Sequence, residues 1–287
     1  FSSGTFTLYG TNLVRYNNNS DINPLALQIS GKAQNSYTLI NSTIELNYNS
    51  STQYTLNISG SDKTQINRLI DSDGTQALDN SSYLLHTTDH WNGSGSTIDI
   101  NNLITVSDYQ PPEITSAHYN FSTGELTVYG KYLVRADNNS DITTSLLTLY
   151  GTNRADSGRE SYTLSSYPNT PILSSTQFTI TLNTLDQSYW HGLLNQDGTQ
   201  SINQQSYALT TAPNWNDTGS TIDRDNPITI EGYQPPTITS AYYHYSSGKL
   251  LLFGEELVRY QNSSDIDPPK LKLQGRGLNS YTLTTLG

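Results

Sequence analysis

The chain has 287 residues, a net charge of −11, and neither cysteine nor methionine. This acidic balance excludes nucleic acid as an expected partner and disfavours an anionic membrane surface, because both need clustered lysine and arginine. The absence of cysteine excludes a disulfide framework, a thiolate metal site and a cysteine nucleophile. No apolar run approaches the ~20 residues of a membrane span, so we expect no direct membrane insertion in this segment.

The first predicted element is a strand near the start of the chain, and its sequence occurs three times. Phe6 and Leu8 alternate with other residues at period two, which indicates a strand with one buried face. The segment Phe1–Arg15 returns at Phe121–Arg135 with nine of fifteen residues identical, and again at Tyr245–Arg259. In the two later copies an ITSA segment and a glycine-containing turn precede the strand, which predicts a β-hairpin. The buried pairs expected in these copies are Leu126 with Val128 and Leu250 with Leu252.

Further short motifs repeat in the same order along the chain. SYTL, DGTQ, GSTID and YQPP each recur 119 to 125 residues apart, which indicates copies of one sequence unit. The YQPP motif marks the boundaries, since two prolines favour a semi-rigid, extended connection. We predict a repeat that lacks its first strand at 1–110, a complete repeat at 111–234 and a partial repeat at 235–287, and we expect the parent chain to be longer.

The elements within one copy predict an all-β fold. Alternating segments give about seven strands per copy, the number typical of an immunoglobulin-like β-sandwich. One insertion departs from this pattern, because Asp62–Asp71 carries apolar residues at helical spacing. We therefore predict tandem immunoglobulin-like β-sandwich modules, each with about seven strands and one short inserted helix. Gly74, and Gly198 in the next copy, are the predicted C-terminal caps of these helices.

The order of these motifs resembles a tandem immunoglobulin-like repeat module of very large bacterial surface and adhesin-type proteins. The matching residues are Pro111–Val134, Ser140–Ile142, Ser161–Leu164, Asp197–Thr199 and Asn214–Asn216. The resemblance covers essentially the whole chain and implies an immunoglobulin-like fold, secretion, and a role as a spacer or adhesive segment. The chain departs from that pattern in being richer in tyrosine and asparagine and in having fewer glycine-rich loops.

No catalytic motif is recognisable, and we predict that the chain is not an enzyme. Its five histidines have no counterparts between copies and no metal-site spacing, so we expect polar surface residues. Calcium is the one metal considered, because Asp137, Asn139 and Asp141 place oxygen ligands on alternate residues of a loop, and Asp71–Gly74 carries a similar partial pattern. We instead favour a role for the Asp141 carboxylate in capping a turn or in pairing with Arg135, the recurring arginine six residues earlier. We therefore assign no catalytic, cofactor-binding or metal-ligating residue, and no cofactor.

Asparagine sequons in polar loops predict N-linked glycans, provided that the host has the machinery for attachment. One set, Asn18, Asn138 and Asn262, occupies the same loop in all three copies, and a second, Asn92 and Asn216, follows a tryptophan in two copies. We expect these loops to be exposed, as attachment requires. The alternative is that duplication copied polar loops that carry no modification.

Aromatic side chains form the remaining candidate contact surface. If the apolar pairs of the repeated strand face inward, Tyr9, Tyr129 and Phe253 face outward at one position of the three copies. Together with Trp91 and Trp215, these rings could stack on sugars or on a neighbouring fibre. The alternative, which we favour, is that a loop or an adjacent module covers the rings of the repeated strand.

The function that these features favour is a structural or adhesive repeat segment of an extracellular surface protein or filament, acting as a semi-rigid spacer. Its expected partners are neighbouring repeats of the same chain, other copies in a fibre or lattice, and glycans. The alternatives are a carbohydrate-binding module array and a surface-layer lattice subunit. Rings that line an open groove would favour sugar binding, whereas rings packed against a neighbouring chain would favour a filament or lattice.

Overall fold

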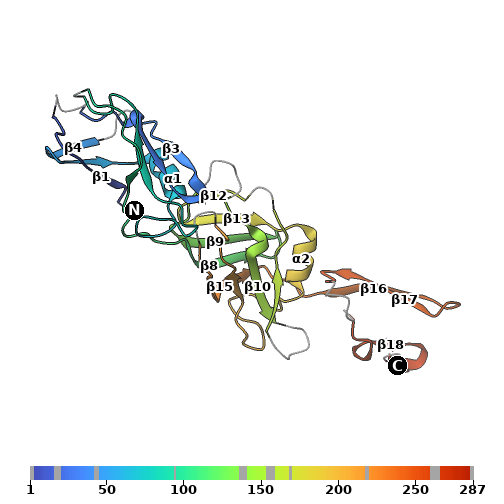
Figure 1. Ribbon diagram of the computed structural model, residues 1–287. Helices are drawn as coiled ribbons and strands as arrows, with labels where there is room; N and C mark the ends of the chain where they lie inside the picture. Colours follow the sequence, from blue (N-terminus) through green and yellow to red (C-terminus); the bar gives the residue numbers. More distant parts are fainter. Residues whose placement is uncertain are drawn as a thin grey trace.

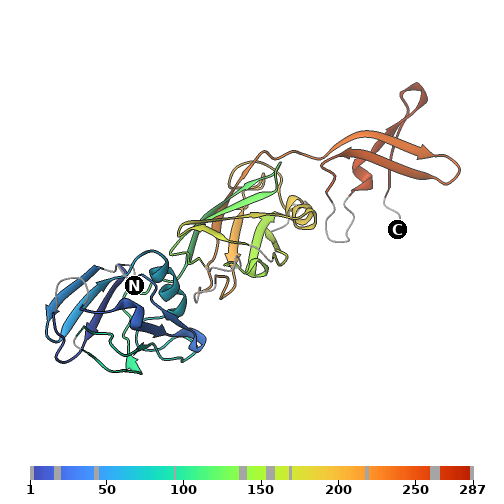
Figure 2. The same cartoon turned by 90° about the horizontal axis from the view of Figure 1, so that it is seen from above.

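The computed structural model describes residues 3–15, 21–41, 45–93, 95–135, 141–152, 159–167, 170–216, 220–258 and 266–284. Strands account for 42% and helical residues for 13%, which confirms the all-β prediction. Figure 1 shows the strands in groups that follow one another along the chain, from blue at the N-terminus to red at the C-terminus. Figure 2 shows the same succession from above. No described strand pairs with a strand on the other side of residue 110 or residue 234.

Residues 5–103 form two sheets and one α-helix. Strands β1, β5 and β4 make a three-stranded sheet in that order, and strands β3, β2, β6 and β7 make a four-stranded sheet. Leu8, Leu27 and Leu56, which come from both sheets, belong to one buried cluster, so the two sheets face each other. The elements are β1 (Thr5–Tyr9), η1 (Pro24–Ala26), β2 (Leu27–Ser30), η2 (Lys32–Gln34), β3 (Ser36–Thr38), β4 (Glu45–Ser50), β5 (Gln53–Asn57), α1 (Gly60–Leu69), β6 (Leu84–Thr87) and β7 (Asn102–Leu103).

Residues 113–231 form one sheet of eight strands around a second core. The strand order is β11-β10-β14-β15-β8-β9-β13-β12, and each neighbouring pair is antiparallel except β15 with β8. Leu149 of β10 and Phe178 of β13, near opposite ends of this order, share one buried cluster, so the sheet curls around the core. The elements are β8 (Glu113–Asn120), β9 (Glu125–Lys131), η3 (Thr144–Leu146), β10 (Leu147–Thr152), β11 (Arg159–Thr163), β12 (Ile172–Ser174), β13 (Gln177–Thr181), α2 (Thr184–His191), β14 (Ala208–Thr211) and β15 (Asn226–Glu231).

The C-terminal residues form two antiparallel hairpins. Strand β16 pairs with β17, and β18 pairs with β19. Strand β16 is exposed along its whole length. Strand β8, which has the same residue at five of eight aligned positions, buries Ile114, Ala117 and Tyr119 because it lies inside a sheet that closes around a core. The elements are β16 (Thr237–His244), β17 (Lys249–Glu255), η4 (Pro268–Lys270), β18 (Lys272–Gln274), η5 (Arg276–Leu278) and β19 (Ser280–Thr282).

The repeated strand buries both predicted side chains in the second copy, but Phe6 in the first copy and Leu250 and Leu252 in the third are only half-buried. Leu126 and Val128 on β9 are fully buried, and Leu8 on β1 is 6% exposed. Burial of one such side chain contributes about 1.5–3 kcal/mol. The predicted hairpin β8–β9 is also present, and Gly124 in its turn has a φ of 68°, a conformation that glycine adopts without steric cost.

The two inserted helices are present, but the prediction of their caps is wrong. Helix α1 is followed by an extended residue, and α2 ends at a C-cap formed by Gly192. Gly74 and Gly198 lie beyond the helices, with φ values of 98° and 97°. Each instead forms a β-bridge, Gly74 with Val106 and Gly198 with Ile230. The glycines therefore serve turns that contact the segment near the end of each copy, which is β15 in the second copy and lies just after β7 in the first.

Candidate functional site

The aromatic side chains predicted to face outward form an exposed position that recurs on three strands. Tyr9 is 79% exposed on β1, Tyr129 is 41% exposed on β9, and Phe253 is 51% exposed on β17. Tyr9 and Tyr129 lie opposite Gln53 and Gln177 in the corresponding strand pairs. This exposure corrects the expectation that a loop or an adjacent part of the chain covers the rings. Each ring offers a face that can stack on a sugar or on an apolar patch of a neighbour.

Trp215 lies in the core and not on the surface. It is fully buried, its indole N–H donates to the Thr221 carbonyl at 3.2 Å, and its ring lies 6.3 Å from that of Phe178. The prediction of a surface contact at Trp215 is therefore wrong, because no face of the ring is accessible. Trp91, its counterpart in the first copy, makes the same bond to Thr97 at 3.1 Å and is only partly buried.

The asparagines that follow these tryptophans are buried. Asn216 has no exposed surface, and its Nδ2 donates to the carbonyls of Asp141 at 2.9 Å and Val134 at 3.4 Å. A glycan is attached through this same nitrogen, so the prediction of glycosylation at Asn216 is corrected. Asn92 is 3% exposed, and the same correction applies to it. The other predicted glycosylation residues, Asn18, Asn138 and Asn262, lie outside the described residues.

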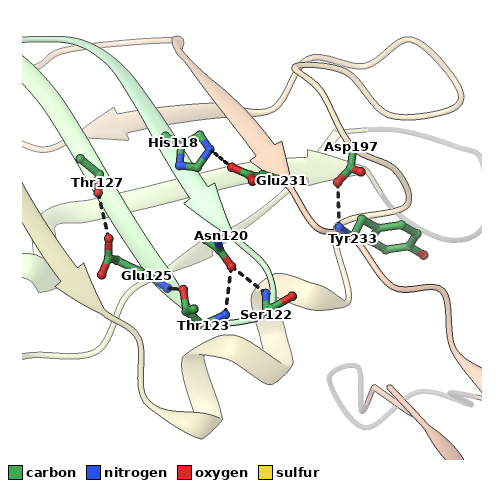
Figure 3. Close-up of polar contacts among 9 residues, drawn as sticks. All are labelled: His118, Asn120, Ser122, Thr123, Glu125, Thr127, Asp197, Glu231 and Tyr233. Atoms are coloured by element: carbon green, nitrogen blue, oxygen red, sulfur yellow. Dashed lines mark hydrogen bonds and ion pairs between the residues drawn. The ribbon is translucent and has the colours of Figure 1, made fainter.

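The segment that leads from one copy to the next is held by a recurring aspartate. The Asp197 side chain accepts a hydrogen bond from the backbone N–H of Tyr233 at 2.7 Å, as Figure 3 shows. In the first copy, Asp73 accepts one from the N–H of Tyr109 at 2.8 Å. The ring of Tyr233 also lies edge-on to that of Phe121, with centroids 5.4 Å apart. These contacts bind the YQPP segment to the copy that precedes it.

Polar contacts also surround the end of β15 and the turn after β8. The side chain of Asn120 accepts hydrogen bonds from the backbone N–H groups of Ser122 and Thr123, both at 3.1 Å (Figure 3). His118 on β8 lies 3.0 Å from the carboxylate of Glu231 on β15. The asparagine closes the hairpin turn, whereas an exposed ion pair of this kind contributes little to stability.

A buried aspartate, which the sequence did not single out, links each helix to the adjoining strand. Asp186 on α2 has no exposed surface and accepts hydrogen bonds from the hydroxyls of Tyr162 and Tyr167, each at 2.5 Å, and of Ser165 at 2.6 Å. Burial and the bond to Asp186 raise the pKa of Tyr162 to about 12, so its hydroxyl remains a donor. Asp62 on α1 is equally buried and accepts from a tyrosine hydroxyl at 2.7 Å. The available sequence signal is one aspartate in the first turn of both helices.

His191, at the end of α2, corrects the expectation that the histidines are polar surface residues. It is 8% exposed, its Nε2 lies 2.8 Å from the Tyr119 hydroxyl, and its ring stacks on that of Phe121 at 3.6 Å. Burial lowers the pKa of His191 to about 4. The imidazole is therefore neutral at pH 7 and serves as a packed part of the core.

The chain is expected to unfold more easily as the pH falls from 6.5 to 4, because of His191. In this range the unfolded chain binds a proton at the ordinary histidine pKa, and the folded chain does not. The stability that the neutral ring contributes is thus present above pH 6.5. Acidification to pH 4 is expected to lower the free energy of unfolding by about 2 kcal/mol. Urea midpoints should show this loss in the chain but not in His191→Asn, which introduces the residue found at Asn67 in the first copy. Identical pH dependence in the two proteins would contradict the assignment.

The carboxylates considered for calcium serve hydrogen bonds where the structure describes them. Asp137 and Asn139 lie outside the described residues. Asp141 is 1% exposed, and its Oδ2 accepts from the N–H of Ile172 at 2.7 Å. Asp71 is also buried and accepts from a backbone N–H at 2.9 Å. In the part of the chain that the structure describes, no group of three or more histidine, cysteine, aspartate or glutamate side chains could hold a metal ion.

The remaining observations concern membranes and known proteins. Neither helix among the described residues has the length and apolar character needed to cross a bilayer. No protein-family model and no curated protein matches the chain.

Proposed function

We propose that the chain is a structural or adhesive repeat segment of an extracellular surface protein or filament, acting as a semi-rigid spacer. In this proposal, residues 111–234 are a complete immunoglobulin-like β-sandwich module, residues 1–110 are a module that lacks its first strand, and residues 235–287 are part of a third. Support comes from contacts that recur at equivalent positions of the first two copies. These are the buried aspartate of the helix, the tryptophan bond to a nearby carbonyl, and the aspartate that holds the YQPP segment.

The pairing of the first and last strands of residues 111–234 carries this proposal. Strands β8 and β15 run parallel, with Ala117 opposite Ile228 and Asn120 opposite Glu231. Tension along the chain therefore pulls the start of β8 and the end of β15 in opposite directions along the strands. The evenly spaced hydrogen bonds between them resist together, whereas bonds pulled from one end break one after another. This shear geometry suits a spacer that works under tension.

The connection between copies supports the semi-rigid character of the spacer. Only Gly232–Pro236 separates β15 from β16. Within this segment the N–H of Tyr233 is bound to Asp197. Pro235 and Pro236 have fixed φ angles and also restrict the residues that precede them. Few backbone angles are therefore left to bend between one copy and the next.

Force spectroscopy of the chain, held at its two ends, tests the proposal. Unfolding of residues 113–231 releases roughly 40 nm of contour length, at about 3.4 Å per residue, and this length identifies the event. The N–H of Thr229 points towards β8, because its neighbour Ile230 bonds to Gly198 on the other edge of β15. Thr229→Pro removes that donor and is expected to lower the unfolding force, whereas Thr229→Ala keeps it. An equal force for both variants and the unchanged chain would refute the shear geometry.

The exposed rings favour adhesion between chains over a carbohydrate-binding array. Tyr9 and Trp91 border a groove in the first copy. In residues 113–231 the corresponding place is filled by β8, and Trp215 is buried. The second copy therefore has no such groove among its described residues. It does have an exposed ring, Tyr129, at the position that Tyr9 occupies in the first copy. A row of single rings suits contacts with neighbouring chains in a filament or lattice.

A further inference from the structure

The outward face of strand β9 carries an exposed ring between two opposite charges. Its outward side chains are, in chain order, Glu125, Thr127, Tyr129 and Lys131. The hydroxyl of Thr127 donates to the carboxylate of Glu125 at 3.5 Å, so both side chains lie on this face (Figure 3). Successive residues on one face of a strand are about 6.8 Å apart, which places the acid and the lysine about 20 Å apart with the ring between them.

The third copy carries the same row with its charges exchanged. On β17 the outward side chains are Lys249, Leu251, Phe253 and Glu255. Each lies 124 residues (249 − 125) after its counterpart on β9, so a lysine replaces the acid, an acid replaces the lysine, and an aromatic ring is kept. The net charge of the row is unchanged and its direction is reversed. The row on β17 is therefore the electrostatic complement of the row on β9.

The row on β9 is accessible to another chain. Strand β9 lies between β8 and β13 within the eight-stranded sheet, and Tyr129 is 41% exposed with both neighbours in place. The Lys131 amine lies 3.9 Å from the carboxylate of Glu113, and both side chains are more than half exposed. An exposed pair at this distance contributes little to stability, so the lysine can exchange this partner for a carboxylate of a neighbouring chain.

Two arrangements of neighbouring chains bring opposite charges of these rows together. In an antiparallel pair of second copies, Glu125 faces Lys131 of the other chain, but each Tyr129 ring then faces Thr127, which is only 8% exposed. In a parallel pair offset by one copy, β9 faces β17, so both charges of β9 meet opposite charges and Tyr129 meets Phe253. The parallel, offset arrangement alone pairs the charges and the rings together, and a ring pair is itself favourable.

We propose that β9 of one chain binds β17 of a second, parallel copy of this chain that is displaced by one repeat. The inference rests on the proposed function and specifies the partner of the exposed rings. Facing sheets pack about 10 Å apart, a distance that a glutamate and a lysine span together and that two rings fill. One such contact is weak, because exposed ion pairs contribute little. Several contacts along two parallel chains act together, since linked sites raise the overall affinity.

Carbodiimide cross-linking of the intact chain tests the arrangement, because this reagent joins a carboxylate to an amine where the two are in contact. At millimolar protein concentration and low ionic strength, we expect a cross-linked dimer. Mass spectrometry of the dimer should identify Glu125 joined to Lys249 and Lys131 joined to Glu255. The pair of Glu113 and Lys131 within one chain is the internal control for the reaction. High salt should suppress the dimer, because it screens exposed charges.

Exchange of the charges in one copy alone should separate the two arrangements. Glu125→Lys with Lys131→Glu leaves the composition unchanged, but like charges then face each other in the offset pair. We expect association, measured by sedimentation equilibrium, to weaken about tenfold. Addition of Lys249→Glu with Glu255→Lys should restore it. Tyr129→Ala should weaken association about fivefold, whereas Tyr129→Phe should not, because it keeps the ring.

Three results would overturn the proposal. One is a chain that remains monomeric at millimolar concentration, and another is a dimer in which Glu125 is joined to Lys131 of the other chain. The third is association that the charge exchange in the second copy leaves unchanged. The force measurement follows one chain at a time and does not involve this face. Failure of the lateral contact therefore leaves the spacer proposal standing, and failure of the shear geometry leaves the cross-linking result interpretable.

Discussion

Replacement of Asp186 by alanine is expected to lower the free energy of unfolding of residues 111–234 by about 3 kcal/mol. The carboxylate has no exposed surface and accepts hydrogen bonds from Tyr162, Tyr167 and Ser165. Alanine leaves these hydroxyl groups without their acceptor, and an unsatisfied buried donor costs about 1–3 kcal/mol. All three donor residues are partly exposed, so water can replace some of the lost hydrogen bonds. The expected total is therefore close to the smallest sum of the three individual costs.

Urea unfolding followed by tryptophan fluorescence measures this loss, because Trp190 and Trp215 both report on this copy. Asp186→Asn keeps the shape and one acceptor oxygen, and it should cost less than the alanine variant. Glu125→Ala changes an exposed acid on β9 and should stay within about 0.5 kcal/mol of the unchanged chain. If Asp186→Ala cost no more than Glu125→Ala, the aspartate would not be the link between helix and sheet.

The largest effect of a single substitution is expected for Trp215→Ala, about 4 kcal/mol. The ring is fully buried beside Phe178, so its removal leaves a large cavity in the core. The carbonyl of Thr221 also loses its donor. Both losses act on the folded state alone, and the urea midpoint of this copy should fall accordingly.

Trp91→Ala is the matched control for Trp215→Ala. Trp91 makes the same hydrogen bond in the first copy, but its ring is partly exposed, so its removal should cost about half as much. Trp215→Phe refills most of the cavity and should recover a large part of the loss. Unchanged stability of Trp215→Ala, combined with weaker binding to a partner, would instead support a surface role for this ring.

The strands could be predicted because alternation reports burial directly. Leu126 and Val128 face the core since successive side chains of a strand point to opposite faces, a rule that needs no knowledge of distant residues. The glycines were only partly predictable. The sequence indicated a chain reversal at Gly74 and Gly198, but their bridging partners, Val106 and Ile230, lie more than 30 residues further along the chain. The local pattern therefore predicted correctly that these glycines have positive φ, but it assigned them to the ends of the helices and not to the bridged turns that follow.

The polar residues of the site were harder to predict, because their burial depends on partners far away in the sequence. The sequon at Asn216 is typical of exposed loops, but its Nδ2 bonds to the carbonyl of Asp141. Asp186 resembles an ordinary acid in the first turn of a helix, and only the fold brings Tyr162 to it. The outward direction of Tyr129 followed from alternation, whereas its exposure depended on whether other segments cover it.

The parallel pairing of β8 with β15 also determines when a copy can finish folding. Ala117 and Ile228 are neighbours although 111 positions (228 − 117) separate them in the sequence. Such pairings form late, since the loop between them must be closed first. During synthesis β8 waits for its neighbour until nearly the whole copy has left the ribosome. By then β16, which has the same residue as β8 at five of eight aligned positions, follows soon after β15 in the chain. We expect misfolding of this chain to take the form of an exchange of these two strands between adjacent copies.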